Sequence, residues 1–456
     1  MATKQWTGSG DWFSTLWLDI STATPAPSGP PQPGDIAYVF RGTLTITAAD
    51  AASHPTIDGI ALHFASLSAD IVPTLDITNV AFGAGMVIDN RVNDNSALVI
   101  ARGTASLGGQ LEAGGISGAI LTLDIEAAAG VATFTNSGTI EADNTGSLEV
   151  IGTADATLDN SGLLLASDGS ADIAVPVVST GTISATETGT LTLEDGLVNS
   201  GDVTVVDFGV LSVSLDVANT GTIAGDGGTL ALTDVSNQGT IIEAGATATI
   251  TDDAGGFDNA GQVLDQSGTL VITGRGPVGN GEGVGGVGGV GGSGTISIAA
   301  EVDIGGVVSP AQHITFANSD AMLRMSDPAD FGATITNMTG HDLIDLQGII
   351  ADSTTYDSGT GTLGVFDGTT EIASLLVSGL TGNLGVASDN DGGTILTLEQ
   401  GGTPAQVTQY MIANSADAGG AHNWPLPDPI ITYSFNAASD WTATEQAAFQ
   451  NAMTLW

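Results

Sequence analysis

The sequence predicts an all-β protein that folds as a parallel β-helix (a β-solenoid) with about 20 residues per coil, because a short pattern recurs at that period. The pattern is Asn-x-Gly-x-aliphatic, and its copies lie between Asn136 and Val263. A second apolar alternation follows most copies, as in Gly146–Val150. The composition agrees, because 65 Gly and 5% aromatic residues suit a narrow core of small and aliphatic side chains. The copies begin at Asn136, Asn160, Asn199, Asn219, Asn237 and Asn259, with Ser179 in the place of Asn in one more.

Each repeat is expected to contain two strands and two turns, because two short stretches in it alternate apolar and polar side chains. The alternation places Ile140 and Leu148 on one face, and Thr139 and Glu149 on the other, as in a half-buried strand. A unit of about 20 residues cannot bury its apolar face alone. Stacked coils must therefore place each aliphatic side chain over its equivalent in the next coil.

The repeated Asn and Gly residues are expected to form scaffold rather than to bind a ligand. Both residue types tolerate left-handed backbone conformations, so we expect them to bend the chain between strands. Stacked Asn side chains can also hydrogen-bond along the axis of the solenoid.

A column of outward threonines is expected beside the repeated glycines. A flat threonine surface could bind ice or sugar, but β-branched residues in register also stabilise ordinary sheets. Other residue types interrupt the column, which favours the stabilising role. The column contains Thr139, Thr182, Thr222 and Thr240, and the interrupting residues are Leu163, Asp202 and Gln262.

The N-terminal residues 1–50 are expected to form an aromatic cap. They contain Trp6, Trp12 and Trp17, which can cover the open end of the first coil. An aromatic platform that binds sugar is the alternative role for these rings.

Residues 51–400 are expected to form the solenoid. The regular coils occupy 131–273, and terminal coils occupy 295–400. Between them, the Gly-rich segment 274–294 has too few side chains to form a core and is expected to be a loop. A polar linker is expected at 401–429.

The charge balance excludes several classes of partner. The chain has 51 Asp and Glu against 6 Lys and Arg, with a formal net charge of -45 at pH 7. Nucleic acids and anionic membranes bind basic side chains, so we expect neither as a partner. The scattered acids indicate a solvated outer face, with calcium binding as the second interpretation. The chain has no Cys, which excludes disulfides, thiolate zinc sites and cysteine nucleophiles.

The N-terminal segment Met1–Trp6 has no apolar stretch of the signal-peptide kind. No window of the sequence has the uninterrupted apolar length that a membrane span needs. If the chain is exported, the export signal is therefore expected to lie elsewhere than at the N-terminus.

Segments at both ends of the predicted solenoid carry a distinctive pattern. Trp6–Trp12, followed by Pro33–Asp35 and Thr43–Thr47, resembles the opening of large bacterial secreted β-helix proteins of the adhesin and autotransporter type. Phe331–Thr336 and then Gly340–Leu346 resemble a block near the end of such passenger solenoids. The resemblance implies a secreted or cell-surface protein whose partner is an extracellular or cell-surface glycan or protein.

Residues 430–456 are expected to form a short strand and a helix. Ile430–Phe435 is rich in β-branched and aromatic residues, and Thr442–Glu445 is a capping box that opens a helix. The segment resembles the first strand and first helix of serralysin-like and matrixin-like zinc metalloproteases. That resemblance implies a zinc-binding His-Glu-x-x-His element further downstream, and this chain does not contain it.

No catalytic residue is assigned in this chain. The histidines are far apart and none precedes Glu, so the i, i+4 spacing of paired zinc ligands does not occur. The arginines are isolated, which weakens a polysaccharide-cleaving site built from clustered acids and bases. The residues concerned are His54, His63, His313, His341 and His422, and Arg41, Arg91, Arg102, Arg275 and Arg324.

Asp389 and Asp391 are the candidate metal ligands. They lie in the run Asp-Asn-Asp-Gly-Gly, whose composition indicates a turn first. A calcium loop needs more spaced oxygens and a distal Glu, so calcium is the second interpretation. No other cofactor is expected in this chain.

We therefore predict a non-catalytic extracellular β-solenoid that serves as a surface or adhesin-like stalk or as a targeting region. One alternative is the N-terminal region of a secreted serralysin-like zinc metalloprotease whose catalytic part is missing. The other alternative is a polysaccharide-active β-helix enzyme.

Overall fold

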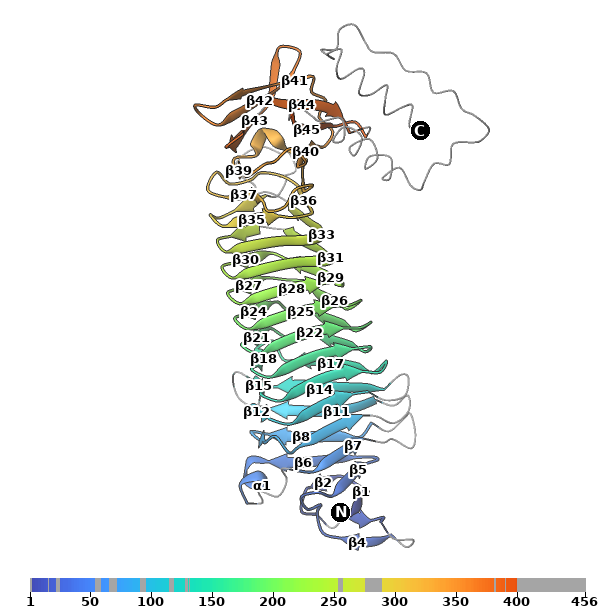
Figure 1. Cartoon of the computed structure of the whole chain (residues 1–456). Coiled ribbons are helices and arrows are strands. Elements are labelled where there is room, and N and C mark those ends of the chain that lie inside the picture. Colours follow the sequence, from blue (N-terminus) through green and yellow to red (C-terminus); the bar gives the residue numbers. More distant parts are fainter. Residues whose placement is uncertain are drawn as a thin grey trace, which may run out of the picture. The chain divides into compact units, whose positions relative to one another are not determined.

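The computed structural model describes residues 2–14, 16–21, 25–53, 59–64, 72–90, 96–114, 119–127, 130, 132–252, 257–274, 289–380, 383–389 and 391–399. The chain divides into two units, Met1–Thr397 and Leu398–Trp456. The first unit is built from β-strands that wind into stacked coils (Figure 1). The expected linker at 401–429 and the strand and helix at 430–456 lie outside the described residues, so they stay predictions.

The predicted parallel β-helix is confirmed, and its strands form three parallel ladders. The first ladder contains β5 (Ile36–Val39), β7 (Ala61–Phe64), β10 (Val87–Asn90), β13 (Gln110–Ala113), β16 (Thr139–Asp143), β19 (Leu163–Ser167), β22 (Thr182–Thr186), β25 (Asp202–Val206), β28 (Thr222–Asp226), β31 (Thr240–Asp252), β33 (Gln262–Gly274), β35 (Thr295–Ile298), β37 (His313–Phe316) and β39 (Thr334–Thr336).

The second ladder lies next in each coil and also uses the later halves of β31 and β33. Its other strands are β6 (Thr43–Thr47), β8 (Thr74–Thr78), β11 (Ser96–Arg102), β14 (Ile120–Glu126), β17 (Ser147–Gly152), β20 (Ser170–Ile173), β23 (Thr190–Leu193), β26 (Val210–Val213), β29 (Thr229–Thr233), β36 (Glu301–Ile304), β38 (Met322–Met325) and β40 (Leu343–Leu346).

The third ladder consists of short strands, and six of them end at the repeated Asn. They are β9 (Ala81–Phe82), β12 (Thr104–Leu107), β15 (Ala132–Asn136), β18 (Ala156–Asn160), β21 (Val177–Ser179), β24 (Leu197–Asn199), β27 (Val217–Asn219), β30 (Val235–Asn237), β32 (Phe257–Asn259) and β34 (Val290–Gly291). A regular coil therefore contains three strands, and the expected count of two was wrong. Strands of three residues show too little alternation to be recognised from sequence.

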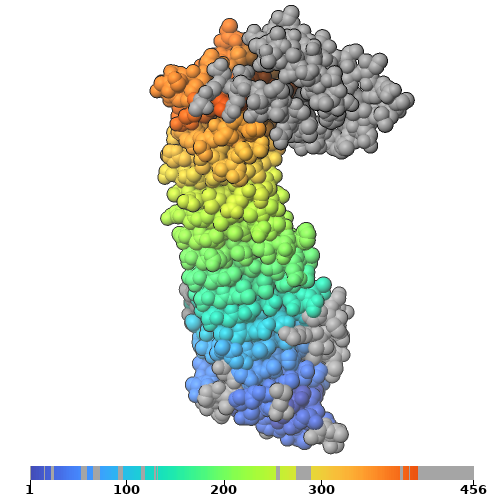
Figure 2. Space-filling model, viewed as in Figure 1, coloured from blue at the N-terminus to red at the C-terminus, as the bar shows by residue number. Residues whose placement is uncertain are grey.

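The core is a set of columns in which each aliphatic side chain lies over its equivalent in the next coil. The main column lies in the first ladder, and each of its side chains is 0% exposed. Burial of such a side chain stabilises the fold by roughly 1.5–3 kcal/mol. The coils form a continuous packed surface on the face seen in Figure 2. The column contains Ile140, Leu164, Ile183, Val203, Ile223, Ile241 and Val263, as the repeat predicts.

The repeated Asn residues form a buried hydrogen-bonded ladder. Asn199 Nδ2 donates to Asn219 Oδ1 at 2.9 Å, and Asn219 Nδ2 donates to Asn237 Oδ1 at 2.8 Å. The ladder continues from Asn237 to Asn259 at 2.9 Å. The expected hydrogen bonding along the axis is therefore confirmed, and it satisfies polar groups that lie inside the coil.

The repeated Asn and Gly residues do not adopt the left-handed conformation that we expected. Positive φ angles occur instead at other corner residues, such as Asp168 (φ 55) and Asp207 (φ 56). The glycines are needed because successive coils approach closely at this corner. A Cβ on Gly221 would lie 2.1 Å from the carbonyl oxygen of Gly201, so no side chain fits there.

The three N-terminal tryptophans are buried, which excludes the sugar-binding platform on these rings. Trp6, Trp12 and Trp17 are each 0% exposed, and the Trp17 ring lies 5.1 Å and 5.2 Å from the other two ring centres. The first coil is flanked by β2 (Gly10–Asp11) and by an antiparallel set of β1 (Thr3–Trp6), β3 (Trp17–Asp19) and β4 (Ala26–Ser28). β1 also pairs in parallel with β5, so the tryptophans close the end of the core.

The parallel ladders end at β39 and β40, and antiparallel pairings follow within the same unit. β39 pairs in parallel with β43 (Thr370–Ser378), which forms an antiparallel set with β42 (Thr362–Asp367) and β41 (Ser353–Asp357). β45 (Thr394–Glu399) pairs antiparallel with β40, and β44 (Asn383–Ser388) precedes it. Antiparallel strands thus cover the open edge of the last coil.

Helices are short among the described residues. They are α1 (Ala48–Ser53) and the 3-10 turn η2 (Pro328–Asp330). No helix in this part of the chain is long and apolar enough to cross a membrane. Of the expected Gly-rich loop, residues 275–288 lie outside the described range, and β34 occupies part of its end.

Candidate functional site

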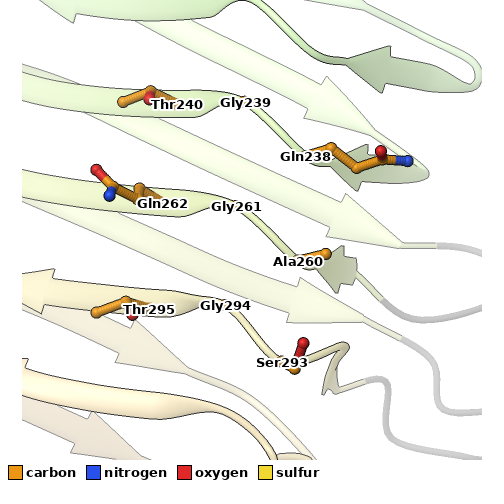
Figure 3. A pocket seen from close by; sticks show the side chains of 9 residues that line it. All are labelled: Gln238, Gly239, Thr240, Ala260, Gly261, Gln262, Ser293, Gly294 and Thr295. Atoms are coloured by element: carbon orange, nitrogen blue, oxygen red, sulfur yellow. The ribbon is translucent and has the colours of Figure 1, made fainter.

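A groove lies at the corner between the third and first ladders, and three stacked glycines form its floor (Figure 3). A Cβ on Gly261 would lie 2.2 Å from the carbonyl oxygen of Gly239, and one on Gly294 would lie 2.3 Å from that of Gly261. Contact this close excludes side chains from the floor. The hollow above these glycines, which we call the corner groove, has a volume of ≈ 440 Å³.

The walls of the corner groove are uncharged. Thr240, Gln262 and Thr295 stand on one side of the glycine column and pair in register at the starts of β31, β33 and β35 (Figure 3). Amides and hydroxyls both donate and accept hydrogen bonds, so these walls can exchange hydrogen bonds with a neutral polar ligand. The opposite wall contains Gln238, Ala260 and Ser293.

The glycine column continues along earlier coils with hydroxyl side chains beside it. There the hydroxyls hydrogen-bond to the preceding coil. Ser200 Oγ donates to the Ser179 carbonyl oxygen at 3.3 Å, and Thr220 Oγ1 donates to the Asn199 carbonyl oxygen at 3.2 Å. The corner groove differs because its walls carry two amides, Gln238 and Gln262, which reach further than hydroxyls. The earlier glycines are Gly138, Gly162, Gly181, Gly201 and Gly221.

The predicted outward threonine column is present on the first ladder. Thr182, Asp202 and Thr222 pair in register, and Thr222 pairs with Thr240 at the wall of the corner groove. Asp202 interrupts the column with a charge, as expected from the sequence.

The second ladder presents a charge-free outer face from β23 to β33. Acids gather instead at the corner between the first two ladders, where Asp168 and Glu187 hydrogen-bond to each other. This bond lowers the pKa of Asp168 and raises the pKa of Glu187. The charge-free outward residues are Thr190, Thr192, Val210, Ser212, Thr229, Ala231, Thr247, Thr249, Thr269 and Val271.

Titratable residues form a column in the first ladder, and the sequence analysis had considered only His63 among them. Tyr38, His63, Asp89, Glu112 and Glu141 pair in register through successive coils. Asp89 is 1% exposed and its Oδ1 contacts His63 Nδ1, while Glu112 is 3% exposed and its Oε2 accepts from Gln110 Nε2 at 2.8 Å. The Asp89 carboxylate thus joins two neighbouring coils, whereas the Glu112 carboxylate bonds a residue of its own strand, β13.

The candidate metal ligands Asp389 and Asp391 lie in the turn between β44 and β45. Asp389 Oδ1 accepts hydrogen bonds from the backbone N–H groups of Asp391 at 2.7 Å and Gly393 at 2.8 Å. The Asp389 carboxylate therefore stabilises the turn, which is the first interpretation of this run. Among the described residues, no group of three or more His, Asp or Glu side chains could hold a metal ion.

The described histidines lie apart from one another. His63 contacts Asp89 in the first ladder, His313 begins β37, and His341 Nδ1 lies 3.4 Å from Asp320 Oδ1. His54 and His422 are outside the described residues.

Two of the arginines join neighbouring coils. Arg102 lies 3.1 Å from Asp76 and also contacts Glu126. Arg324 lies 3.1 Å from Asp345 and also contacts Glu301. These ion pairs give both arginines a structural role between coils.

Comparisons with known proteins add no assignment. No protein-family model matches the chain. A comparison with curated proteins also finds no match.

Proposed function

We propose that the chain is a non-catalytic extracellular β-solenoid, an adhesin-like stalk that binds an uncharged glycan at the corner groove. The observation that supports this proposal is the lining of the groove. Gln238, Gln262 and the neighbouring hydroxyls are all uncharged, in a protein whose formal net charge is -45. Such a lining offers hydrogen bonds to sugar hydroxyls, while the surrounding acids repel anionic chains.

The repeat architecture supports the role of a stalk. Each coil contacts only its neighbours, so adding coils extends the structure without changing the way it is stabilised. Backbone hydrogen bonds of three ladders and the Asn ladder join successive coils along the regular region. The resulting stack can present a binding surface at a distance from its point of attachment.

The test is binding of the purified chain to soluble polysaccharides: neutral dextran and mannan, and anionic polygalacturonate. We expect binding to a neutral chain and none to the anionic one. Replacing both Gln238 and Gln262 by Ala removes the two wall amides and should weaken binding by roughly tenfold, because each lost hydrogen bond contributes about 0.5–1.5 kcal/mol.

The matched control is Gln266→Ala, which removes an exposed amide from β33 at the other corner of the coil. This variant should bind like the parent chain. Binding that is unaffected by the double substitution contradicts the assignment of the groove. Release of shortened sugar products would contradict the proposed non-catalytic stalk and support the alternative of a polysaccharide-active β-helix enzyme.

A further inference from the structure

Two carboxyl groups occupy the apolar interior of the first ladder. Glu243 on β31 and Asp265 on β33 pair in register and are 0% and 1% exposed. An isolated ionised carboxylate in such a place is costly, so a pair of them needs a proton or a cation. From Ala142 to Phe316 the other members of this inward column are apolar residues or Gly, namely Ala142, Ala166, Ala185, Val205, Gly225, Ile298 and Phe316.

Both carboxyl groups accept backbone hydrogen bonds on one side. Glu243 Oε1 accepts from the Ala246 N–H at 2.6 Å, and Asp265 Oδ2 accepts from the N–H groups of Ala299 at 3.1 Å and Ala300 at 2.7 Å. The Ser267 N–H is a second backbone donor to the Glu243 carboxyl. Glu243 Oε2 and Asp265 Oδ1 are buried and have no hydrogen-bond donor among the described residues.

The two carboxyl groups hydrogen-bond to each other. Ionised carboxylates only accept hydrogen bonds, so this bond exists only when one of the two carries a proton. A single proton shared by the two carboxyl groups therefore makes one of them a donor and leaves the other an acceptor.

No other charged group faces the pair from the elements packed on it. On β28, Gly225 lies opposite Glu243, and the next residue, Asp226, is exposed. On β35, Ile298 lies opposite Asp265. On β36, Glu301 forms an ion pair with Arg324 of the following coil. Within the described residues, each carboxyl is thus the other's titratable partner.

We propose that Glu243 and Asp265 form a proton-sharing pair inside the solenoid, and that loss of the shared proton in alkaline solution loosens the coils of β31 and β33. The pair lies three residues beyond Thr240 and Gln262 in these two strands. Local opening of β31 and β33 would therefore begin next to the corner groove. The proton-sharing pair is expected whether or not the groove binds a ligand.

The direction of the pH dependence follows from the pKa of Glu243. Burial is the larger cause and the hydrogen bond with Asp265 the next, and together they raise the pKa of Glu243 from 4.5 to about 8. Burial also raises the pKa of Asp265. The folded coils therefore hold a proton that the unfolded chain releases above pH 4.5, and their stability is lost as the pH rises through about 8.

The test is hydrogen exchange measured by mass spectrometry from pH 5 to pH 9, corrected for the intrinsic pH dependence of exchange. The hydrogen-exchange protection factors of residues 240–274 should fall by about tenfold per pH unit up to the pKa of Glu243 in the folded protein, because local opening releases one proton. Peptides from residues 210–224 serve as the internal reference. In Glu243→Gln, the amide donates a hydrogen bond to Asp265 and does not titrate. The dependence of the protection factors on pH should therefore disappear.

Glu194→Gln is the matched control, because Glu194 is an exposed acid in the same solenoid; it should keep the parent slope. An infrared difference spectrum of the parent protein is the second measurement, and it should show a protonated carboxyl band at pH 7 that Glu243→Gln lacks. Absence of that band, or an unchanged slope in Glu243→Gln, overturns the proposal. Protection restored at pH 9 by calcium chloride, but not by sodium chloride of equal ionic strength, overturns it in favour of a cation site.

Discussion

Removal of one member of the Asn ladder gives the most direct measure of what joins the coils. Asn219 is 1% exposed, accepts from Asn199 Nδ2 at 2.9 Å and donates to Asn237 Oδ1 at 2.8 Å. Asn219→Ala leaves a buried donor and a buried acceptor without these partners, at a cost of about 1–3 kcal/mol each. Asn199 Nδ2 keeps a bond of 3.1 Å to the Thr222 carbonyl oxygen, so we expect a total loss of about 2–4 kcal/mol.

The loss is measured as the change in free energy of unfolding in urea, with hydrogen exchange over residues 197–240 to locate it. Local exchange is needed because a stacked-coil protein opens in units rather than as a whole. Gln238→Ala is the control, since it removes an exposed amide in the adjacent coil and should change stability by less than about 0.5 kcal/mol. If Asn219→Ala destabilises the protein no more than this control, the ladder contributes nothing to stability and our reasoning fails.

Two further substitutions test the corner glycines and the tryptophan cap. Gly221→Ala places a Cβ 2.1 Å from the Gly201 carbonyl oxygen and should destabilise by about 3 kcal/mol or more, whereas Gly29→Ala, with nothing within 4 Å, should be neutral in the same urea titration. Trp17→Ala should lower stability by about 3–5 kcal/mol and speed exchange in β5 and β6, while Phe208→Ala, at a side chain that is 79% exposed, should do neither. If a substitution and its control changed the stability equally, the role assigned to that glycine or that tryptophan would be contradicted.

The period of the repeat was enough to predict the stacking of the regular coils. Ile183, Val203 and Ile223 recur at one spacing and alternate with polar neighbours, and these two facts together require a column. The Asn ladder followed from the same period. The third strand was missed because a segment such as Leu197–Asn199 has one outward residue and thus no pattern to detect.

The local reason for the glycines could not be derived from sequence. Left-handed conformation and close backbone approach both select Gly, and a one-dimensional pattern does not distinguish them. Only the packing of Gly221 against Gly201 identifies the second cause. The burial of the carboxyl pair, by contrast, could have been predicted from the sequence. Glu243 and Asp265 lie two residues after Ile241 and Val263, so the strand alternation places them on the same inward face.

The position of the carboxyl pair has a physical explanation in the way these two coils turn. Regular coils pass from the first to the second ladder through a residue such as Asp207, with φ 56. β31 instead runs through the corner as one strand, with register shifts around Ala244 and a glycine, Gly245, at φ 73. An irregular corner presents backbone N–H groups to the interior, and there Glu243 accepts that of Ala246. Asp265 does the same for the following coil, and two such acceptors can be neighbours only if they share a proton.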